Sequence, residues 1–451
     1  VDHDQYVAAG WGYDSLGRNS IGLIRLDASG LEIEKKHYSP PEFHSYYPGN
    51  VGAFIHNNNG GYNMTGSVWD STGNTNVYMF WFNSLLDTTN YIEIDLGKDE
   101  LAYQCKQTPD NGFIITGKSE DGNNIDILLL KLDSSGGYEW HKTYGGPETE
   151  LGIRVSTAFD GGYIIGGYTK SFGNGDFDTY IIKTDSLGNI EWDMTYGDQN
   201  FDPTAKIIQL SDSNYIISSS IKKYDIGSYE QRKLRLIKID TVGSVIWDKE
   251  YGTPRYGTGS GDAIELENGD LIVIAQTTDT TGSSPAGNGF PEGVILKVSS
   301  EGDSIWWRKI EYSETIDAHN YPRAIKQTND GGFVGAGFIL PGTGDGGTQD
   351  MWVFKLDSEG YNTGFEPIAQ QGKLMSIYPN PASGTFTVSI DNIEPNQMIT
   401  LYNHLGGRIN EFPVITERTA IDVSNLANGV YLVQVTQNNL VVGHQKVVLR
   451  N

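Results

Sequence analysis

Short apolar runs, separated by turn-forming residues, extend through the first four-fifths of the chain. Each run begins with a large apolar anchor that follows an acidic residue or Asn and one or two intervening residues. The anchors are Tyr6, Tyr62, Phe113, Tyr163, Tyr215, Leu271 and Phe333, and successive anchors lie 50 to 62 residues apart. A period of this length is typical of repeat architectures, in which each repeat forms one supersecondary unit.

Two further phrases follow most anchors. One is a run ending in Lys, an apolar residue and Asp, and the other leads from a Trp to a Tyr-Gly pair, as in Trp192 to Gly197. The clearest repeat holds four short runs, at residues 154–157, 163–169, 179–184 and 190–196. Gly-containing turns separate most of these runs. The pattern predicts an all-β protein whose residues 1–360 form a seven-bladed β-propeller with four-stranded blades of about 50–60 residues.

The first repeat is incomplete. It begins almost at its anchor, Tyr6, so it lacks the leading strand that every other repeat has. Either the stretch after Asp357, around residues 365–369, closes the ring, or a piece upstream of Val1 completed it. The sequence leaves both alternatives open.

The periodicity stops after Gly360, and residues 361–372 have the Asn, Gly, Pro and Gln content of a linker. Residues 373–451 return to alternating apolar and polar positions. The predicted strands there are 385–390, 398–403, 429–436 and 446–449, which indicate a small antiparallel β-sandwich. Basic and acidic residues balance in this part, so the chain's net charge of −25 lies before it. This change of composition supports a domain boundary.

Four ordered motifs make the C-terminal part recognisable. They are Ser376-Ile377-Tyr378-Pro379-Asn380-Pro381 with Gly384, Leu405-Gly406, Leu426-Ala427-Asn428-Gly429-Val430-Tyr431-Leu432, and Lys446-Val447-Val448-Leu449. In this order they resemble the type A C-terminal sorting domain of the type IX secretion system of Bacteroidota. Gly407 departs from the polar residue that many relatives have after Leu-Gly, which puts the detail of that turn in doubt.

The resemblance implies where the protein is exported rather than which activity it has. Such domains are bound by the outer-membrane translocon and its shuttle barrel after periplasmic transit, and are commonly cleaved as the cargo is attached to surface lipopolysaccharide or released. By motif position, the recognised signal comprises Pro379, Asn380, Pro381, Gly429, Tyr431 and Lys446. The alternative role of the same residues is to fold the sandwich. The propeller also resembles Gly- and Asp-rich repeat propellers of secreted proteins from these bacteria, which implies a fold only.

Charge and cysteine content exclude several classes of function. The chain has 32 Lys and Arg residues against 57 Asp and Glu residues. This balance argues against a nucleic-acid partner and against docking on anionic lipid. No apolar stretch approaches the length of a membrane-spanning helix. The lone Cys105 allows no internal disulfide and is expected to be a core thiol.

Motifs for cofactor or metal chemistry are weak. Residues 112–119 fit the phosphate-loop pattern, but their middle is a predicted strand and a turn follows, so the match is a coincidence. Acidic loops recur between the second and third strands, and structural calcium is the only cofactor they could suggest. These loops hold Asp121 with Asp126, Asn174 with Asp176 and Asp178, and Asp345 with Asp350. None completes an EF-hand, and the His residues have no metal-ligand spacing, so we assign no metal or cofactor.

No catalytic motif emerges from the sequence either, because a nucleophile elbow and a zinc-protease motif are both missing from it. Aromatic and His residues outside the repeat phase are the candidates for a ligand site, with core packing as the alternative: Trp11, His44, Tyr46, Tyr47, Trp69 and Trp81. The long loops at 222–233, 277–291 and 340–349 offer a second surface. We therefore expect an extracellular or surface-exposed binding or adhesion module for glycan or protein. A structural scaffold is the second hypothesis, and a polysaccharide-degrading enzyme the third.

Overall fold

A computed structural model gives the fold. It describes residues 5–28, 30–41, 44–49, 52–69, 73–122, 124–174, 176–198, 206–226, 229–256, 258–278, 291–310, 319–340, 350–363, 375–390, 393, 396–403, 408–437 and 440–450. The chain divides into two compact units, residues 1–367 and 368–451. Among the residues described, no helix is long and apolar enough to cross a bilayer.

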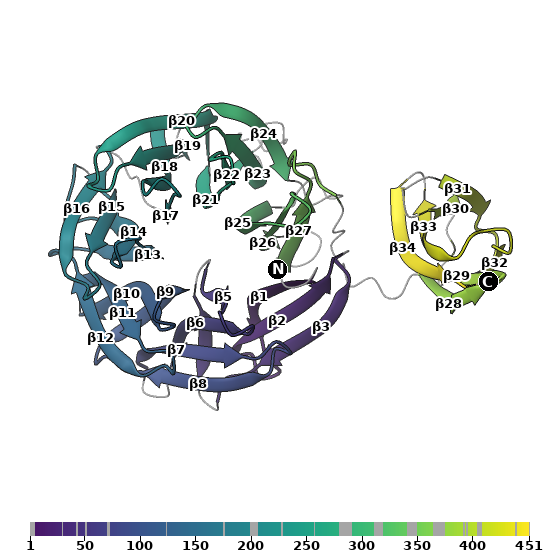
Figure 1. Cartoon of the computed structure of the whole chain (residues 1–451), viewed down its shortest axis with the longest axis horizontal. Helices are drawn as coiled ribbons and strands as arrows, with labels where there is room; N and C mark the ends of the chain where they lie inside the picture. Colours follow the sequence, from purple (N-terminus) through teal and green to yellow (C-terminus); the bar gives the residue numbers. More distant parts are fainter. Residues whose placement is uncertain are drawn as a thin grey trace. The chain divides into compact units, whose positions relative to one another are not determined.

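Seven antiparallel sheets of the first unit form a ring, so the predicted β-propeller is confirmed (Figure 1). We call the sheets blades one to seven in chain order. In the described part of the chain, the sheet of blade one consists of three strands, β1 (Gln5–Tyr13), β2 (Asn19–Asp27) and β3 (Glu32–Tyr38). Blade two has five described strands because its inner edge is split in two, and blade seven has three.

Each blade runs from an inner strand beside the ring axis to an outer strand. The inner strands are β4 (Ser45–Pro48) with β5 (Phe54–His56), β9 (Asp99–Gln107), β13 (Glu150–Thr157), β17 (Lys206–Gln209), β21 (Gly259–Glu265) and β25 (His319–Gln327). The second strands are β1 (Gln5–Tyr13), β6 (Tyr62–Trp69), β10 (Phe113–Asp121), β14 (Tyr163–Thr169), β18 (Tyr215–Ile226), β22 (Leu271–Thr278) and β26 (Phe333–Leu340). The third strands are β2 (Asn19–Asp27), β7 (Thr75–Phe82), β11 (Asn124–Leu132), β15 (Asp178–Thr184), β19 (Tyr229–Ile239), β23 (Pro291–Val298) and β27 (Asp350–Leu356). The outer strands are β3 (Glu32–Tyr38), β8 (Thr88–Ile94), β12 (Tyr138–Tyr144), β16 (Ile190–Tyr196), β20 (Val245–Tyr256) and β24 (Ser304–Ile310).

The apolar pattern follows from where each strand stands in its blade. The middle strands are covered on both faces by the neighbouring blades, so every residue of β15 is buried. Strand β16, at the outer edge of the same blade, is mostly exposed, with two partly buried positions and one buried residue at its end. Burying both faces of a strand explains why its sequence reads as a nearly continuous apolar run rather than as an alternation.

The recurring Trp and Tyr residues fasten each blade to the next. The Tyr196 hydroxyl donates to the Gly243 carbonyl at 2.7 Å, in the turn between the third and outer strands of the following blade. The Trp192 ring lies over the same turn, and its Nε1 donates to the Thr241 carbonyl at 3.0 Å. Gly243 has a φ of +85°, and a Cβ there would lie 3.2 Å from the Trp192 ring. Equivalent Tyr-to-Gly bonds follow Trp140 and Trp247.

Blades one and seven meet through side chains. Tyr6 and Leu26 of blade one are buried with Val334 and Val353 of blade seven in one apolar cluster. Among the described residues, the sheet of blade one pairs three strands, all of its own repeat. The predicted closing stretch at residues 365–369 lies outside the described residues.

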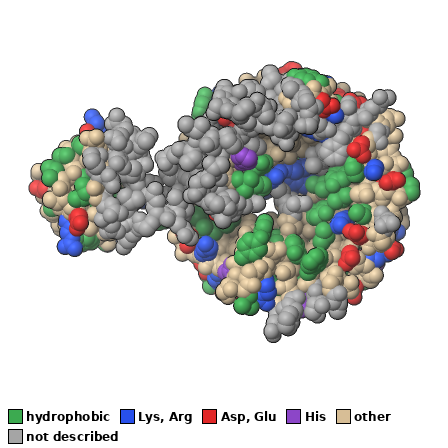
Figure 2. Space-filling model, turned by 180° about the vertical axis from the view of Figure 1, so that it is seen from behind, with side chains coloured by type: hydrophobic (Ala, Val, Ile, Leu, Met, Phe, Trp, Pro, Cys, Tyr) green, Lys and Arg blue, Asp and Glu red, His purple; other side chains and the backbone are tan. Residues whose placement is uncertain are grey.

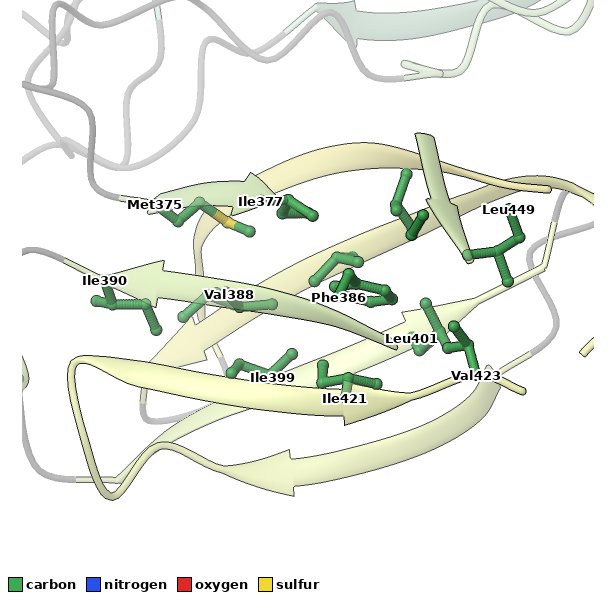
Figure 3. Packing of buried hydrophobic residues seen from close by; sticks show 14 residues of the cluster. Met375, Ile377, Phe386, Val388, Ile390, Ile399, Leu401, Ile421, Val423 and Leu449 are labelled. Atoms are coloured by element: carbon green, nitrogen blue, oxygen red, sulfur yellow. The ribbon is translucent and has the colours of Figure 1, made fainter. Parts of the chain in front are cut away.

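The second unit is the predicted antiparallel sandwich. Its strands are β28 (Met375–Ser383), β29 (Thr385–Ile390), β30 (Gln397–Tyr402), β31 (Arg408–Pro413), β32 (Arg418–Asp422), β33 (Gly429–Gln437) and β34 (Leu440–Leu449). Phe386, Val388, Ile399 and Ile421 lie in its core, which is filled by buried hydrophobic side chains (Figure 3). The linker predicted at 361–372 is described only as far as residue 363, so its bounds stay a prediction.

Candidate functional site

Chemically different side chains meet near the propeller axis. They stand on the innermost segments, nine positions before each anchor, and are Ala53, Gln104, Arg154, Lys206, Asp262 and Ala324. The repeat brings the same register position of every blade to the same level of the axis. Charged and polar residues at such an inner position, in place of apolar ones, are therefore a signal of a site. We did not draw this inference from the sequence.

Arg154 and Asp262 form an ion pair across the ring. Nη2 of Arg154 lies 2.5 Å from Oδ1 of Asp262, and the two residues belong to blades four and six, which are not neighbours. Oδ2 of Asp262 also accepts from the Ile325 amide of blade seven at 3.3 Å. On the other side, Gly52 has a φ of +91°, and a Cβ there would lie 2.9 Å from Nη1 of Arg154. The positive φ favours glycine at this position, and a Cβ there would crowd the side chains of Gln104 and Arg154.

Lys206 and Arg323 lie next to this ion pair. Lys206 is 8% exposed, and its Nζ donates to the Ser260 carbonyl at 3.3 Å. Burial and the positive charge of Arg154 lower the pKa of Lys206 to about 7. The guanidinium of Arg323 stands over the rings of Tyr321 and Phe338, at 5.6 and 5.1 Å from their centroids. Burial also lowers the pKa of Arg323.

His319 and Tyr321 complete the cluster at the start of β25. The Tyr321 hydroxyl lies 3.4 Å from Nδ1 of His319. Tyr321 stacks on Phe338 with a centroid separation of 4.6 Å, which fixes the orientation of its ring. Burial lowers the pKa of His319, so its imidazole is neutral at neutral pH and can accept a proton.

This site is rich in positive charge, whereas the whole chain has a net negative charge. Within the described part of the chain, no carboxylate forms an ion pair with Lys206 or Arg323. The one acid beside them, Asp262, is paired with Arg154. Two buried polar atoms near these residues, Oγ of Ser260 and Oδ1 of Asn320, have no partner. Figure 2 shows Lys and Arg side chains in the central hollow of the ring. The site can therefore hold an anionic group, and His319 with Tyr321 can move a proton beside it.

The structure separates the six predicted ligand-site residues. Tyr46 is buried in the core of blade two, and Trp81 packs against Phe113 between blades two and three. Tyr46 is thus part of the packed core, and Trp81 is partly buried against it. His44 is partly buried beside β4.

Three of the predicted aromatics are exposed. They are Trp11, Tyr47 and Trp69, and the last two contact each other edge to face at 5.9 Å. Trp69 pairs with Ser45 at the start of an inner strand, as Leu340 pairs with His319 in blade seven. The exposed aromatics therefore lie on the face of the ring where β25 begins.

The predicted signal residues of the second unit lie mostly at its surface. Pro379, Asn380, Pro381, Gly429 and Lys446 are exposed, whereas Tyr431 packs partly against the core. The Asn380 side chain holds its loop to β34: Nδ2 donates to the Lys446 carbonyl at 2.7 Å, and Oδ1 accepts from the Val448 amide at 2.9 Å. Asn380 thus has a structural role whatever else it contacts.

The other motifs do not form a site in the described residues. Residues 113–119 are part of strand β10, which excludes a phosphate loop. No group of three or more metal-ligating side chains occurs among the residues described. Asp178, at the start of β15, accepts a hydrogen bond from the Asn174 amide, and Asp176 lies in the loop between them. Asp345 and most of the loops at 277–291 and 340–349 lie outside the described residues. Cys105 is buried in β9.

Two family models match parts of the chain. Residues 376–450 match the secretion system C-terminal sorting domain, so the second unit is a sorting domain and the chain is exported to the cell surface or the extracellular space. Residues 162–334 match the arylsulfotransferase family, a match that covers fewer than half of the residues of the chain.

Curated relatives are ulvan lyases. An endo-acting ulvan lyase of Formosa agariphila is 27% identical over 200 residues, which is 41% of this chain and 36% of the relative. An ulvan lyase of Nonlabens ulvanivorans is 26% identical over 232 residues, which is 51% of this chain and 40% of that relative. The match thus spans well under half the length of either relative.

Solved structures of similar fold include a polysaccharide lyase of family PL25, an ulvan lyase, and the polysaccharide lyase Uly1. The first has a TM-score of 0.48 and 10% identity, covering 76% of this chain and 90% of that chain. The second has a TM-score of 0.49 and 8% identity, covering 79% and 89%.

These relatives overturn two expectations. The prediction of a binding or adhesion module is wrong, and so is the ranking of a non-enzyme above an enzyme, because the curated relatives degrade a polysaccharide. The physical reason is that the candidate residues differ from one repeat to the next, so the regular pattern of the repeats does not point to them. A search for motifs shared by the repeats finds no catalytic pattern, while His319, Tyr321 and Arg323 stand together on β25 and Lys206 stands on β17.

Proposed function

We propose that the chain is an exported polysaccharide lyase that cleaves an ulvan-type, uronate-containing polysaccharide at the His319 end of the propeller axis. The observation that carries the proposal is that two cations lie near the His319–Tyr321 pair. These cations, Lys206 and Arg323, have no carboxylate partner among the described residues. The ulvan lyase relatives support the substrate class.

A polysaccharide lyase removes a proton from a carbon atom, so it has to lower the pKa of that C–H group. In a uronate, the proton on C5 is adjacent to the carboxylate, and removing it places negative charge on that carboxylate. Arg323 and Lys206 stabilise this charge because they are preorganised in a site of low dielectric. Lys206 stabilises this negative charge when it is protonated, and a bound carboxylate favours its protonated form.

His319 and Tyr321 supply the proton transfers. With Nδ1–H of His319 donating to the Tyr321 oxygen, Nε2 keeps its lone pair and takes the proton from C5. The C4–O4 bond breaks, a double bond forms between C4 and C5, and the Tyr321 hydroxyl gives its proton to O4. Nothing is oxidised or reduced and no water is added, so the step balances without a co-reactant.

The exposed aromatics extend the substrate site. Trp11, Tyr47 and Trp69 lie on the ring face where β25 begins, and exposed aromatic rings stack well against sugar rings. We assign them to the parts of the polysaccharide that flank the cleaved unit. A Trp69→Ala substitution then raises KM for the polymer and leaves kcat on a short oligosaccharide unchanged.

The sorting domain supplies partners of its own. We assign recognition by the translocon and its shuttle to the exposed loop of Pro379 to Pro381 with Lys446, and attachment to surface lipopolysaccharide after cleavage as the fate of the cargo.

The test measures the ultraviolet absorbance of the unsaturated uronate that a lyase leaves on its product. The full chain is incubated with ulvan, and His319→Ala, Tyr321→Phe and Arg323→Gln are compared with it. His141→Ala is the matched control, since Nδ1 of His141 also meets a tyrosine hydroxyl, that of Tyr138, at 3.0 Å on the outer surface. We expect losses of about 100-fold or more in kcat for the three variants and none for the control.

Two results would contradict the proposal in different ways. An unmodified chain that releases no unsaturated product from ulvan or any other uronan is not a lyase. Full activity in His319→Ala and Arg323→Gln would leave the reaction standing and place it elsewhere on the chain.

A further inference from the structure

A second group of cations stands on the opposite side of the Arg154–Asp262 pair. Lys106 pairs in register with Ile114, and Lys326 pairs with Val334, so both lie one position from the turn between the inner and second strands. Arg154 and Lys206 lie two positions further along the axis, opposite Gly166 and Ser218. His319 and Tyr321 lie further still, at the start of β25. The ion pair therefore separates the two lysines from the proposed lyase site.

Lys106 and Lys326 face one another from blades three and seven. Lys106 is partly buried and Lys326 is exposed. Burial first, and then the charges of Lys326 and Arg154, lower the pKa of Lys106 to about 8. Asp262 is the one acid that acts in the opposite direction, and the neighbouring Cys105 is neutral because burial raises the pKa of its thiol to about 12.

Neither amine has a carboxylate within ion-pair distance among the described residues. Most other lysines on the blades behave differently. Lys131 and Lys183, for example, each contact two carboxylates although they are buried. Two lysines that repel each other without a counter-charge, in a chain of net charge −25, are an arrangement that a bound anion would stabilise.

We propose that Lys106 and Lys326 form a second anion-binding site, which takes a carboxylate or a sulfate group on the side of the axis away from His319. The group is either a free anion or a substituent of a polysaccharide. This site goes beyond the proposed lyase activity and does not depend on it, because none of its residues touches the His319–Tyr321 pair.

Proton linkage is a signature of this site. A bound anion raises the pKa of Lys106, so above about pH 8 binding takes up a proton. Affinity for the anion therefore falls as the pH rises through this range.

The test titrates the full chain with sodium sulfate, with sodium glucuronate and with a sulfated polysaccharide, at constant ionic strength, and follows the melting temperature and the heat of binding. Lys106→Gln and Lys326→Gln are compared with Lys35→Gln, an exposed lysine of the outer strand β3. We expect each of the first two variants to weaken binding about tenfold and the control to leave it unchanged. Binding of the two small salts identifies a free anion, and binding of the polymer alone identifies a substituent.

Three results would overturn the proposal. They are unchanged binding in both Lys106→Gln and Lys326→Gln, an equal loss in Lys35→Gln, or a loss in Arg323→Gln that the two lysine variants do not share. His319→Ala keeps the anion site and loses lyase activity, so failure of one proposal can be told from failure of the other.

Discussion

Lys206→Met should make the propeller more stable and less active. Lys206 is 8% exposed, and burial and the charge of Arg154 lower its pKa from the usual 10.5 to about 7. At about 1.36 kcal/mol for each pKa unit, keeping this lysine charged in the folded chain costs about 5 kcal/mol. Methionine has a similar length and no charge, so it removes this cost.

Two effects reduce the gain. The substitution loses the hydrogen bond from Nζ to the Ser260 carbonyl, at 3.3 Å, and the neighbouring side chains of the wild-type chain relax around the charge. We therefore expect a net stabilisation of about 3 kcal/mol at neutral pH, which corresponds to a rise of about 4 °C in the melting temperature if the ring unfolds as one unit.

The pH dependence identifies the cause. The folded chain holds the Lys206 proton less tightly than the unfolded chain does, so wild-type stability rises with pH between about 7 and 10.5. The advantage of Lys206→Met is complete below about pH 7 and disappears as the pH approaches 10.5. Urea unfolding of both proteins at about pH 6 and about pH 10, with Lys35→Met as the control, measures it. A variant that is less stable than wild type at the lower pH, or a difference that does not depend on pH, would refute the reasoning.

Three further predictions follow from the same geometry. Asp262→Asn removes the charged carboxylate of the cross-ring ion pair with Arg154, so it should destabilise the ring by about 3 kcal/mol in urea unfolding; an unchanged midpoint would contradict a role for this ion pair. The acidic limb of kcat/KM for ulvan cleavage should lie below pH 6.5, because burial lowers the pKa of His319 and only the neutral imidazole accepts a proton; a limb at higher pH would point to another base. Deleting residues 373–451 should trap the propeller in the periplasm, which immunoblotting of cell fractions detects, and normal export of the truncated chain would argue against the sorting role.

Much of the fold could be predicted from the sequence because the same packing and hydrogen bonds recur in every blade of a propeller. Every blade buries its middle strands in the same way, so anchors such as Tyr163 recur at a regular period and predict the strands around them. The Tyr196 and Gly243 positions recur because each junction between blades needs the same bond across it. The sorting domain was recognisable for a different reason, namely that its motifs occur in a set order near its surface loops and core strands.

The candidate site was not predictable in the same way, because it consists of departures from the repeat. Our aromatic candidates were chosen for being out of phase, and that criterion selected the core residue Tyr46 and the partly buried Trp81 together with the exposed Trp69. The axis residues stand in phase, and only their chemistry differs from blade to blade. Arg154 and Asp262 are 108 positions apart, and no local pattern links them.

The sequence by itself determined the blade period and the export domain. These features depend on local alternation, turn residues and ordered motifs, all of which can be observed along the chain. The tertiary structure alone decided which side chains share the axis. Closing the ring brings one level of every inner strand together, so that Arg154 of blade four reaches Asp262 of blade six and leaves Lys206 and Arg323 without a described carboxylate partner. The chemistry of the site is a product of that closure, since the low dielectric that perturbs the pKa of Lys206 and of His319 exists only once the blades surround them.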